Sequence, residues 1–401
     1  MSNIEWTEKT WNPVIGCTRV SEGCRNCYAE VMARRLAAMA IKDGGKGRKA
    51  NYLNVVKHDA MGTPLPQWNG KIELVEEALG DPLRWRKPSM IFVNSMSDLF
   101  HENVPLDYII KVLAVCAICP QHTMQILTKR PERMVEVINM GDLGHQIYRQ
   151  VQEWLDEGEQ GFLGKQWDRV RELSGRSVTG GRHYFMAWNL PLKNVWLGTS
   201  VEDQATADKR IPHLLKCPAA IRFVSAEPLL GAVDIREWIN CWCPNCGSDG
   251  SEGRFPQRNS GASNPKKRGA IYCPSCNKNM PNFPTIDREI NGEWYTFNDI
   301  DWIIVGGESG PGARPCDIDH LLDVMYQCKQ AGVACFIKQL GSKPVTSNAN
   351  LYDFPDHVKF AEYGDAAASA SIILKSPKGS DMSEWPEDLR VRQMPVDGGV
   401  S

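Results

Sequence analysis

The chain has 401 residues, a length that suits two or three domains or one large α/β domain with insertions. It carries 46 Lys and Arg against 48 Asp and Glu, and 42% of its residues are hydrophobic, which excludes a disordered, collagen-like or strongly basic protein. No apolar run approaches the roughly 18 residues that span a bilayer, and the N-terminus lacks a signal-peptide pattern. We therefore expect a cytoplasmic protein with no membrane partner.

Short apolar runs that end in polar residues recur along the chain and predict the strands of a parallel sheet. They cover residues 90–94, 124–128, 195–199, 221–225, 302–306 and 334–338. The intervening stretches 106–119 and 318–331 have helical spacing, so the series indicates repeated β-α units. We expect an α/β fold built on a full or partial parallel β/α barrel, with a doubly wound sheet as the alternative.

Three stretches interrupt the β-α series and define the predicted domains. The first part of the barrel covers residues 1–238 and contains a partly helical insertion at about 139–194. A cysteine-rich insertion covers 239–284, the last part of the barrel 285–345, and a C-terminal extension 346–401. Because parallel strands present functional groups at their carboxyl ends, the polar residues after the strands predict a shared pocket there.

The chain contains 14 cysteines, and the first group of them is tightly spaced. Cys17, Cys24 and Cys27 lie within eleven residues, directly before a helical pattern at 28–40. In a reducing compartment such a group indicates metal or redox chemistry. Three thiolates can bind three irons of a 4Fe–4S cluster and leave the fourth iron open to a small ligand. A zinc site completed by a distant residue and buried thiols without metal are the alternatives.

The cysteine loop resembles that of the radical S-adenosylmethionine enzymes, in which three cysteines follow the first strand of a partial β/α barrel. More narrowly, six sequence blocks resemble a family of phage-borne radical-SAM-like proteins known only as a domain of unknown function. These blocks lie at 11–17, 24–30, 127–131, 198–202, 225–230 and 305–310. The chain departs from the superfamily in its first gap, where six residues rather than three separate Cys17 from Cys24, and Asn26 replaces the usual aromatic residue.

The resemblance implies reductive cleavage of S-adenosylmethionine and a 5′-deoxyadenosyl radical that abstracts a substrate hydrogen. It also implies an electron-donor protein. The matching cofactor-binding candidates at the strand ends are Ser95, Ser97, Asp98, Lys129, Arg130, Ser200 and Glu202. Asp98 suits the ammonium group of the cofactor by charge, and Lys129 or Arg130 suits its carboxylate. Capping or loop roles are the alternative for each residue.

Two further carboxylates are catalytic candidates because each directly follows an apolar strand. Glu227 and Glu308 lie among small residues, where a carboxylate is expected to face the barrel mouth and to bind substrate, orient the adenosine or accept a proton. The alternative is an ion pair with Arg314 or Lys338. Cys316 is a candidate hydrogen donor to a substrate radical.

The second cysteine group predicts a zinc ribbon. Cys243-Pro-Asn-Cys246 and Cys273-Pro-Ser-Cys276 form two knuckles that suit tetrahedral zinc, with an auxiliary iron–sulfur cluster as the alternative. Between residues 241 and 280 six Lys and Arg face two acids, a net charge of +4, so the rest of this −2 chain carries −6. We expect the following residues to contact nucleic acid: Arg254, Arg258, Lys266, Lys267 and Arg268. A ribbon that only braces the fold is the alternative.

These features together predict a radical S-adenosylmethionine enzyme that modifies or rearranges a base substituent in nucleic acid, with thymine hypermodification in phage DNA as the leading case. A phage-encoded protein would work in the host cytoplasm. Two alternatives stay open. One is the same chemistry on a peptide or small molecule, and the other is a non-catalytic, metal-stapled nucleic-acid-binding protein.

Overall fold

The computed structural model describes most of the chain, and the predicted zinc ribbon lies outside the described part. The described residues are 4–180, 186–239, 286–290, 293–297, 300–310, 312–349, 352–362, 370–396 and 399–400. The ribbon residues outside this set are Cys243, Cys246, Cys273, Cys276, Arg254, Arg258, Lys266, Lys267 and Arg268. Their roles in zinc and nucleic-acid binding stay predictions.

The chain divides into two compact units. The first comprises Met1–Thr199 with Lys216–Ala220, and the second comprises Ser200–Leu215 with Ile221–Ser401. No helix among the described residues is both long and apolar enough to cross a membrane.

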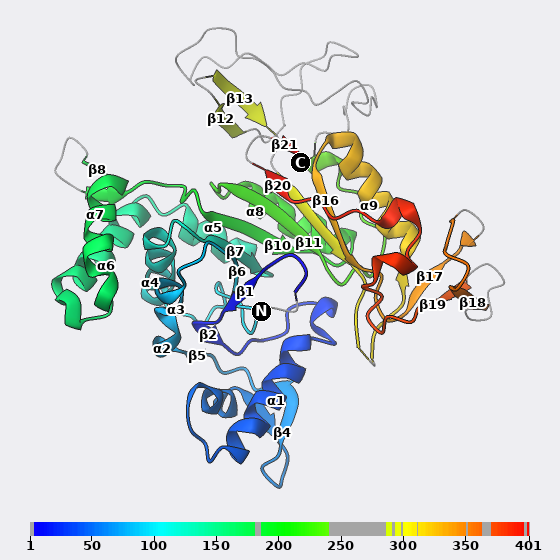
Figure 1. The fold of residues 1–401 in the computed structure, drawn as a ribbon, viewed down its shortest axis with the longest axis horizontal. Coiled ribbons are helices and arrows are strands. Elements are labelled where there is room, and N and C mark those ends of the chain that lie inside the picture. The colour runs from blue at the N-terminus through cyan, green and yellow to red at the C-terminus, as the bar shows by residue number, and fades with distance from the viewer. Residues whose placement is uncertain are drawn as a thin grey trace. The chain divides into compact units, whose positions relative to one another are not determined.

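Among the described strands, β1, β6, β7 and β10 are neighbours in that order in the first unit, and β11, β14 and β16 are neighbours in that order in the second (Figure 1). In the first unit these are β1 (Lys9–Trp11), β6 (Met90–Val93), β7 (Thr123–Thr128) and β10 (Val195–Ser200), the last residue of which, Ser200, belongs to the second unit. In the second unit they are β11 (Ile221–Ala226), β14 (Trp302–Gly306) and β16 (Ala334–Gln339). Within each unit neighbouring strands pair in parallel. All six strands expected from the sequence are confirmed, and the parallel α/β fold is consistent with a partial barrel.

The apolar runs form strands of the sheet because both faces of each strand are covered. All five residues of β14 and all six of β11 are buried, as continuous β-branched and aromatic runs require in a parallel sheet. The rings of Phe223 and Trp302 lie with their centroids 5.7 Å apart, and Phe336 meets Trp302 edge-on at 6.1 Å. This aromatic contact across three adjacent strands forms the core of the second unit.

Helices follow the strands of the first unit, and α4 is nearly enclosed. The helices here are α2 (Glu76–Leu79), α3 (Asp81–Arg84), α4 (Leu106–Ile118), α5 (Pro131–Ile138), α6 (Leu143–Asp156) and α7 (Trp167–Ser177). Helix α6 buries Leu143, Ile147 and Val151, which are spaced four residues apart and therefore share one face. Helices α6 and α7 lie in the stretch predicted as a partly helical insertion, together with β8 (Val178–Gly180) and β9 (Met186–Trp188).

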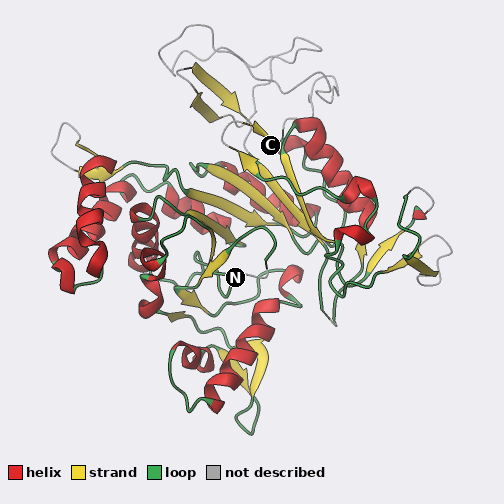
Figure 2. Ribbon diagram, viewed as in Figure 1, coloured by secondary structure: helices red, strands yellow, loops and turns green. Residues whose placement is uncertain are grey.

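A small subdomain around α1 (Tyr28–Lys42) follows the cysteine loop. Its other elements are η1 (Glu22–Cys24), η2 (Arg48–Asn54), β3 (Val56–His58) and β4 (Pro64–Trp68). The helix turns its small residues Ala29, Ala33 and Ala37 inward, where they pack with Tyr52 and Trp68. Figure 2 shows α1 beside β3 and β4, in agreement with the contacts between these elements. Strand β2 (Val14–Ile15), which leads into the loop, pairs with β5 (Glu73–Leu74).

The second unit completes its strands with two long helices and a smaller sheet. The helices are α8 (Gln204–Leu215) and α9 (Ile318–Ala331), with 3-10 turns η5 (Arg236–Trp238), η7 (Met382–Glu384) and η8 (Glu387–Leu389). The smaller sheet joins β15 (Cys316–Asp317), β17 (Pro344–Thr346), β19 (Ala370–Ile373) and β18 (Lys359–Glu362). Separate hairpins are β12 (Ile286–Ile290) with β13 (Glu293–Phe297), and β20 (Pro395–Val396) with β21 (Gly399–Val400). Helix α9 starts where Asp317 accepts the Asp319 N–H, and it ends at Gly332, whose φ is +60°.

Candidate active site

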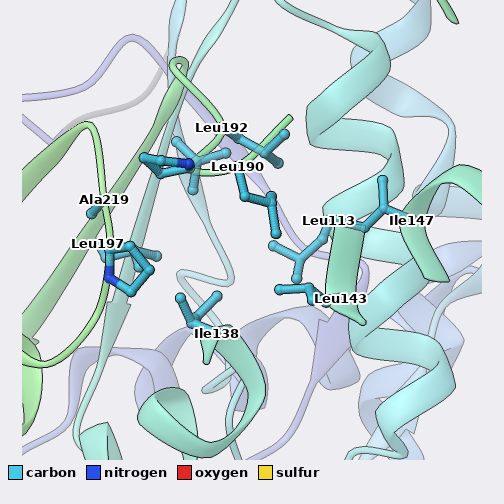
Figure 3. Close-up of a pocket in the computed structure, with 11 residues that line it drawn as sticks. Leu113, Ile138, Leu143, Ile147, Leu190, Leu192, Leu197 and Ala219 are labelled. Carbon is cyan, nitrogen blue, oxygen red and sulfur yellow. The ribbon is translucent and has the colours of Figure 1, made fainter. Parts of the chain in front are cut away.

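An apolar pocket lies in the first unit, but its walls carry no reactive side chain (Figure 3). The lining residues are Leu113, Ile138, Leu143, Ile147, Leu190, Pro191, Leu192, Val195, Leu197, Pro218 and Ala219. Figure 3 shows Leu113, Leu143 and Ile147 on one side of the space and Leu197 and Ala219 on the other. Ligand sites add a few convergent polar groups to apolar walls, and this pocket has none. The polar groups of the first unit gather instead after the parallel strands.

The cysteine loop starts at Gly16, directly after β2. Gly16 has φ +90°, and a Cβ atom there would stand 2.3 Å from the Lys71 carbonyl oxygen, so a side chain does not fit. The Gly16 N–H donates to the Met96 carbonyl oxygen at 3.2 Å. This bond holds the start of the loop against the segment that follows β6, and Cys17 comes next in the chain.

The three predicted thiols lie on one partly buried loop. Cys17 follows Gly16, Cys24 ends η1, and Cys27 directly precedes α1. Burial raises the pKa of Cys17 to about 12, with a further rise from the Asp98 carboxylate and an opposing effect of Arg130. The thiol of Cys17 is thus protonated at neutral pH, and a metal that binds it must displace the proton.

The start of α1 acts on Cys27. Burial raises the pKa of this thiol, whereas the backbone N–H groups of Glu30 and Ala29 lower it. These N–H groups belong to the first turn of the helix, where backbone donors have no partner within the helix itself. They therefore favour negative charge on the Cys27 sulfur.

Arg130 connects the loop to two carboxylates. Its Nη1 lies 3.2 Å from Asp98 Oδ2 and 3.9 Å from Cys17 Sγ, and its Nε lies 2.8 Å from Glu102 Oε2. Its Nη2 donates to both Thr18 Oγ1 at 2.6 Å and the Thr18 carbonyl oxygen at 3.2 Å. The guanidinium group therefore spans three segments that are remote in the sequence, and it brings the predicted residues Asp98 and Arg130 to Cys17.

Asp98 is buried and fully engaged by neighbouring donors. It accepts the Thr128 hydroxyl at 2.7 Å, the Lys129 N–H at 3.0 Å and the Phe100 N–H at 3.0 Å, in addition to Arg130. Such a carboxylate positions the ends of β6 and β7 relative to each other. The sequence-based role for Asp98, binding the ammonium group of a cofactor, stays a prediction. Its contacts in the structure agree with the alternative, in which Asp98 holds the loop after β6 in place.

The two predicted serines after β6 hold the loop by hydrogen bonds. Ser95 Oγ donates to Asn12 Oδ1 at 3.1 Å, and Ser97 Oγ donates to the Val14 carbonyl oxygen at 2.8 Å. The Tyr28 hydroxyl donates to the Ser95 carbonyl oxygen at 2.6 Å. Tyr28, an aromatic residue that follows the last cysteine, thus reaches the predicted cofactor-binding segment.

Asn94 is a strained residue that the sequence reading did not single out. It is 2% exposed and has φ +62°, a left-handed conformation that is uncommon outside glycine. Its Oδ1 accepts the Val14 N–H at 3.3 Å, and its buried Nδ2 has no hydrogen-bond partner among the described residues. A strained strand end with an unmatched donor is typical of a site that meets a ligand or an ordered water.

The contact between Arg19 and Glu30, which the sequence did not predict, holds the cysteine loop against α1. Glu30, in the first turn of α1, is 2% exposed and accepts Arg19 Nε at 3.2 Å and the Trp68 N–H at 3.2 Å. Arg19 lies between the first two cysteines, so the pair ties the middle of the loop to α1 and β4. The acidic residue three positions after Cys27 was the available sequence signal.

His101 belongs to the same polar cluster, and its side chain is neutral. Its Nδ1 accepts the Asn103 N–H at 3.1 Å, so the proton of the neutral ring sits on Nε2, which lies 2.9 Å from Thr18 Oγ1. Burial and the nearby Arg130 lower the pKa of His101, whereas Glu102 acts in the opposite direction. The imidazole therefore donates to the loop without adding charge to it.

The sequence predicts an iron–sulfur cluster held by Cys17, Cys24 and Cys27, and this ligand set stays a prediction. Within the residues that the structure describes, no group of three or more His, Cys, Asp or Glu side chains is gathered around a metal position. The thiols nevertheless affect one another's pKa, Cys27 acting on Cys17 and Cys24 on Cys27. The unmatched Asn94 Nδ2 and the cationic Arg130 add groups suited to an anionic ligand.

The predicted residues after β10 form a buried ion pair within the second unit. Arg210 Nη1 donates to Glu202 Oε2 at 3.0 Å and to the Ser200 carbonyl oxygen at 2.8 Å. The side chain of Glu202 is 1% exposed and that of Arg210 is 5% exposed. Removing one partner of such a pair leaves a buried charge, so the pair fixes the segment that leads into α8.

Glu227 and Glu308 both have the cationic partners that the sequence offered as the alternative. Lys338 Nζ lies 3.1 Å from Glu227 Oε1, and Arg314 Nη2 lies 2.8 Å from Glu308 Oε1. Glu308 Oε2 also accepts the Arg314 N–H at 2.8 Å. Their catalytic roles stay predictions, and each carboxylate is held in place by its cation.

Cys316 lies in β15 of the second unit and is 1% exposed. Burial raises its pKa to about 12, so the thiol keeps its proton at neutral pH. A Cβ atom built on Gly307 would come 2.8 Å from the Cys316 Cβ, which shows how closely the strand packs on the glycine turn after β14. Its predicted role as a hydrogen donor stays untested.

The Arg19–Glu30 pair predicts how firmly the cysteine loop is closed. In Glu30→Gln the amide cannot replace the buried carboxylate, and we expect trypsin to cleave after Arg19 and Arg25 about tenfold faster, as a loss of ~1.4 kcal/mol from the closed loop implies. Mass spectrometry of a digestion time course measures the rate. The matched control is Glu22→Gln, because Glu22 lies on the same loop with its side chain 75% exposed. Equal rates for wild type and Glu30→Gln would refute the bracing role.

The buried His101 predicts a loss of stability in mild acid. The groups that face it are Arg130 and Arg133, which lower its pKa, and Glu102 and Asp98, which raise it; burial dominates and the net shift is downward from 6.5. The unfolded chain therefore binds a proton first, and the free energy of unfolding should fall as the pH drops below about 6.5. In His101→Gln this slope should be smaller by at most ~1.4 kcal/mol per pH unit, measured by urea unfolding between pH 7 and 5. Parallel pH profiles of the two proteins would contradict the assignment.

Residues 1–370 match the family described as Protein of unknown function (DUF5131). No curated protein and no solved structure matches the chain. The matched range includes the cysteine loop, the Arg130 cluster and the paired carboxylates of the second unit. Because it covers most of the 401 residues, the chain belongs to the DUF5131 family of proteins of unknown function.

Proposed function

We propose that this protein is a radical S-adenosylmethionine enzyme that modifies or rearranges a base substituent in nucleic acid, such as thymine in phage DNA. The observation that carries the proposal is the contact of Arg130 with both Cys17 and Asp98. It joins the three-cysteine loop to the residues that the sequence assigns to cofactor binding. A loop of thiols alone would suit structural metal, whereas thiols beside a polar, strained strand end suit a cluster that meets a substrate.

The loop residues have distinct tasks in this proposal. Cys17, Cys24 and Cys27 would hold the cluster, and the N–H groups of the first turn of α1 would offset its negative charge. When bound, a 4Fe–4S cluster with one open iron supplies the electron that cleaves the sulfonium bond of S-adenosylmethionine. Arg130 already donates to Asp98, Glu102 and Thr18, so in this proposal it would hold the loop beside the cofactor, and a cofactor carboxylate would have to displace one of these partners. Asn94 Nδ2 is a buried donor without a protein partner among the described residues.

The nucleic-acid part of the proposal is supported by charge. Residues 241–280 carry +4 in a chain of net charge −2, and five of the six basic residues lie between the two predicted zinc knuckles at 254–268. Lys and Arg close together release counterions from a phosphate backbone, so a polymeric anion is the ligand that best matches such a segment.

Loss of a cluster thiol should abolish both the chromophore and the reaction. Wild-type protein reconstituted under anaerobic conditions should bind about four iron atoms at the loop and, when reduced, convert S-adenosylmethionine to 5′-deoxyadenosine. Cys24→Ala should retain no loop cluster and form no product. Metal and sulfide analysis, visible absorption and chromatography of the nucleoside measure these outcomes.

The matched control is Cys119→Ala, because Cys119 is fully buried outside the loop and should keep the cluster. An intact four-iron cluster that yields no 5′-deoxyadenosine under reduction would refute the enzymatic proposal. An unchanged spectrum in Cys24→Ala would refute the ligand assignment.

The basic segment should set the salt dependence of DNA binding. Replacing Lys266, Lys267 and Arg268 by Gln should weaken binding to a duplex and reduce the slope of log affinity against log salt by up to about three, since each lost phosphate contact removes about one unit. Fluorescence anisotropy at several salt concentrations measures the slope. A triple variant that binds as wild type does would count against a nucleic-acid role for the ribbon.

A further inference from the structure

Helix α1 carries an apolar and basic stripe on the side that faces away from its core. The buried residues Ala29, Ala33, Ala37 and Ala40 define the inner side of the helix. Given 100° per residue, a group of exposed residues lies on the opposite side within an arc of about 100°. We call this group the α1 stripe; it consists of Tyr28, Val31, Met32, Arg35, Met39 and Lys42.

The stripe is unusual for a surface helix because its outer side is normally polar. Tyr28 is 53% exposed and Met39 is 50% exposed. Thirteen large hydrophobic side chains are exposed in the described chain, and seven of them lie between residues 20 and 61. Four of these seven belong to the stripe; the others are Val20 on the cysteine loop, Ile41 on another side of α1 and Met61 at the β3–β4 turn. An apolar patch concentrated in this way indicates a surface that another molecule covers.

The sequence range that contains the stripe carries a net positive charge, although its Arg48 is paired with Asp81 and Glu77 outside the range. Residues 17–49 contain eight Lys and Arg against three Asp and Glu, a net charge of +5, so the remaining chain carries −7. The acid nearest the start of the helix, Glu30, is buried and paired with Arg19, and Asp43 is paired with Lys49. The stripe itself contains no acidic residue. Its partner should therefore be acidic.

The mixture of side chains favours a protein over nucleic acid. Met, aromatic residues and Arg are enriched in the centres of protein interfaces, and Val31, Met32 and Met39 separate the cations here. Nucleic-acid surfaces are more polar and much more basic, and phosphates would meet these aliphatic side chains without gain. A second copy of this chain would bring two positive surfaces together. An acidic protein is the occupant that fits both the charge and the apolar contacts.

We infer that the α1 stripe docks a small acidic one-electron carrier protein, an inference that rests on the proposed function. Tyr28, the first residue of the stripe, directly follows Cys27, so a carrier bound here would lie next to the thiols that hold the cluster. One electron passes from the reduced carrier to the cluster; the carrier is oxidised by one electron, the cluster is reduced by one, and no bond or proton is exchanged.

The test measures binding and electron transfer with full-length protein and a plant-type 2Fe–2S ferredoxin as the probe. Arg35→Glu should weaken ferredoxin binding about tenfold at low salt, and the affinity of the wild type should fall as salt rises. Arg34→Glu is the matched control, since Arg34 is exposed on the same helix about 100° from Arg35 and should change binding by less than about threefold. Calorimetry measures both affinities.

Met32→Ser with Met39→Ser tests the apolar part of the stripe and should also weaken binding, with helix content checked by circular dichroism. In stopped-flow experiments Arg35→Glu should slow reduction of the reconstituted cluster by ferredoxin about tenfold and leave reduction by dithionite unchanged. Equal affinity of wild type, Arg35→Glu and Arg34→Glu for ferredoxin would overturn the inference. The inference would also be overturned if Arg35→Glu lost DNA binding and ferredoxin did not bind the wild-type protein. A reconstituted protein that holds no cluster would refute the proposed function. The affinities for ferredoxin measured by calorimetry would still show whether the α1 stripe is a docking surface.

Discussion

The guanidinium group of Arg130 is the interaction on which the site of the first unit depends. It contacts Cys17 and Thr18 on the loop after β2, Asp98 and Glu102 after β6, and it is itself placed by the end of β7. Without a cation there, two carboxylates would lie beside a thiol that must ionise to bind metal. The planar guanidinium group has five donors and can contact both carboxylates and the thiol at once. The ammonium group of a lysine lacks this geometry.

The same arrangement of a carboxylate and a cation recurs at the strand ends of the second unit. Glu202 meets Arg210, Glu227 meets Lys338, and Glu308 meets Arg314. A carboxylate held by a cation in this way keeps a fixed position. Asn94, which has a left-handed backbone and a side-chain donor without a partner among the described residues, is neutral. In this molecule polar residues at strand ends are thus mostly rigid supports.

Charge is segregated along the chain although the sum is near zero. Two basic regions, residues 17–49 and 241–280, carry +5 and +4, which leaves −11 on the rest of a −2 chain. The first region combines its charge with exposed aliphatic side chains, and the second combines it with polar and glycine-rich sequence. This difference in chemistry suggests two different partners, a protein for the first region and a phosphate polymer for the second.

The sequence by itself determined the six apolar strands, the helices between them and the grouping of Cys17, Cys24 and Cys27, because strand burial and thiol spacing are local patterns. It also named Lys338 and Arg314 as possible partners of the catalytic candidates. Only the tertiary structure decided that those pairs form, that Arg130 reaches Cys17, and that Glu30 braces Arg19. These contacts join residues up to 113 positions apart, and which of many charged residues meet depends on how the strand ends are brought together, which no local pattern records.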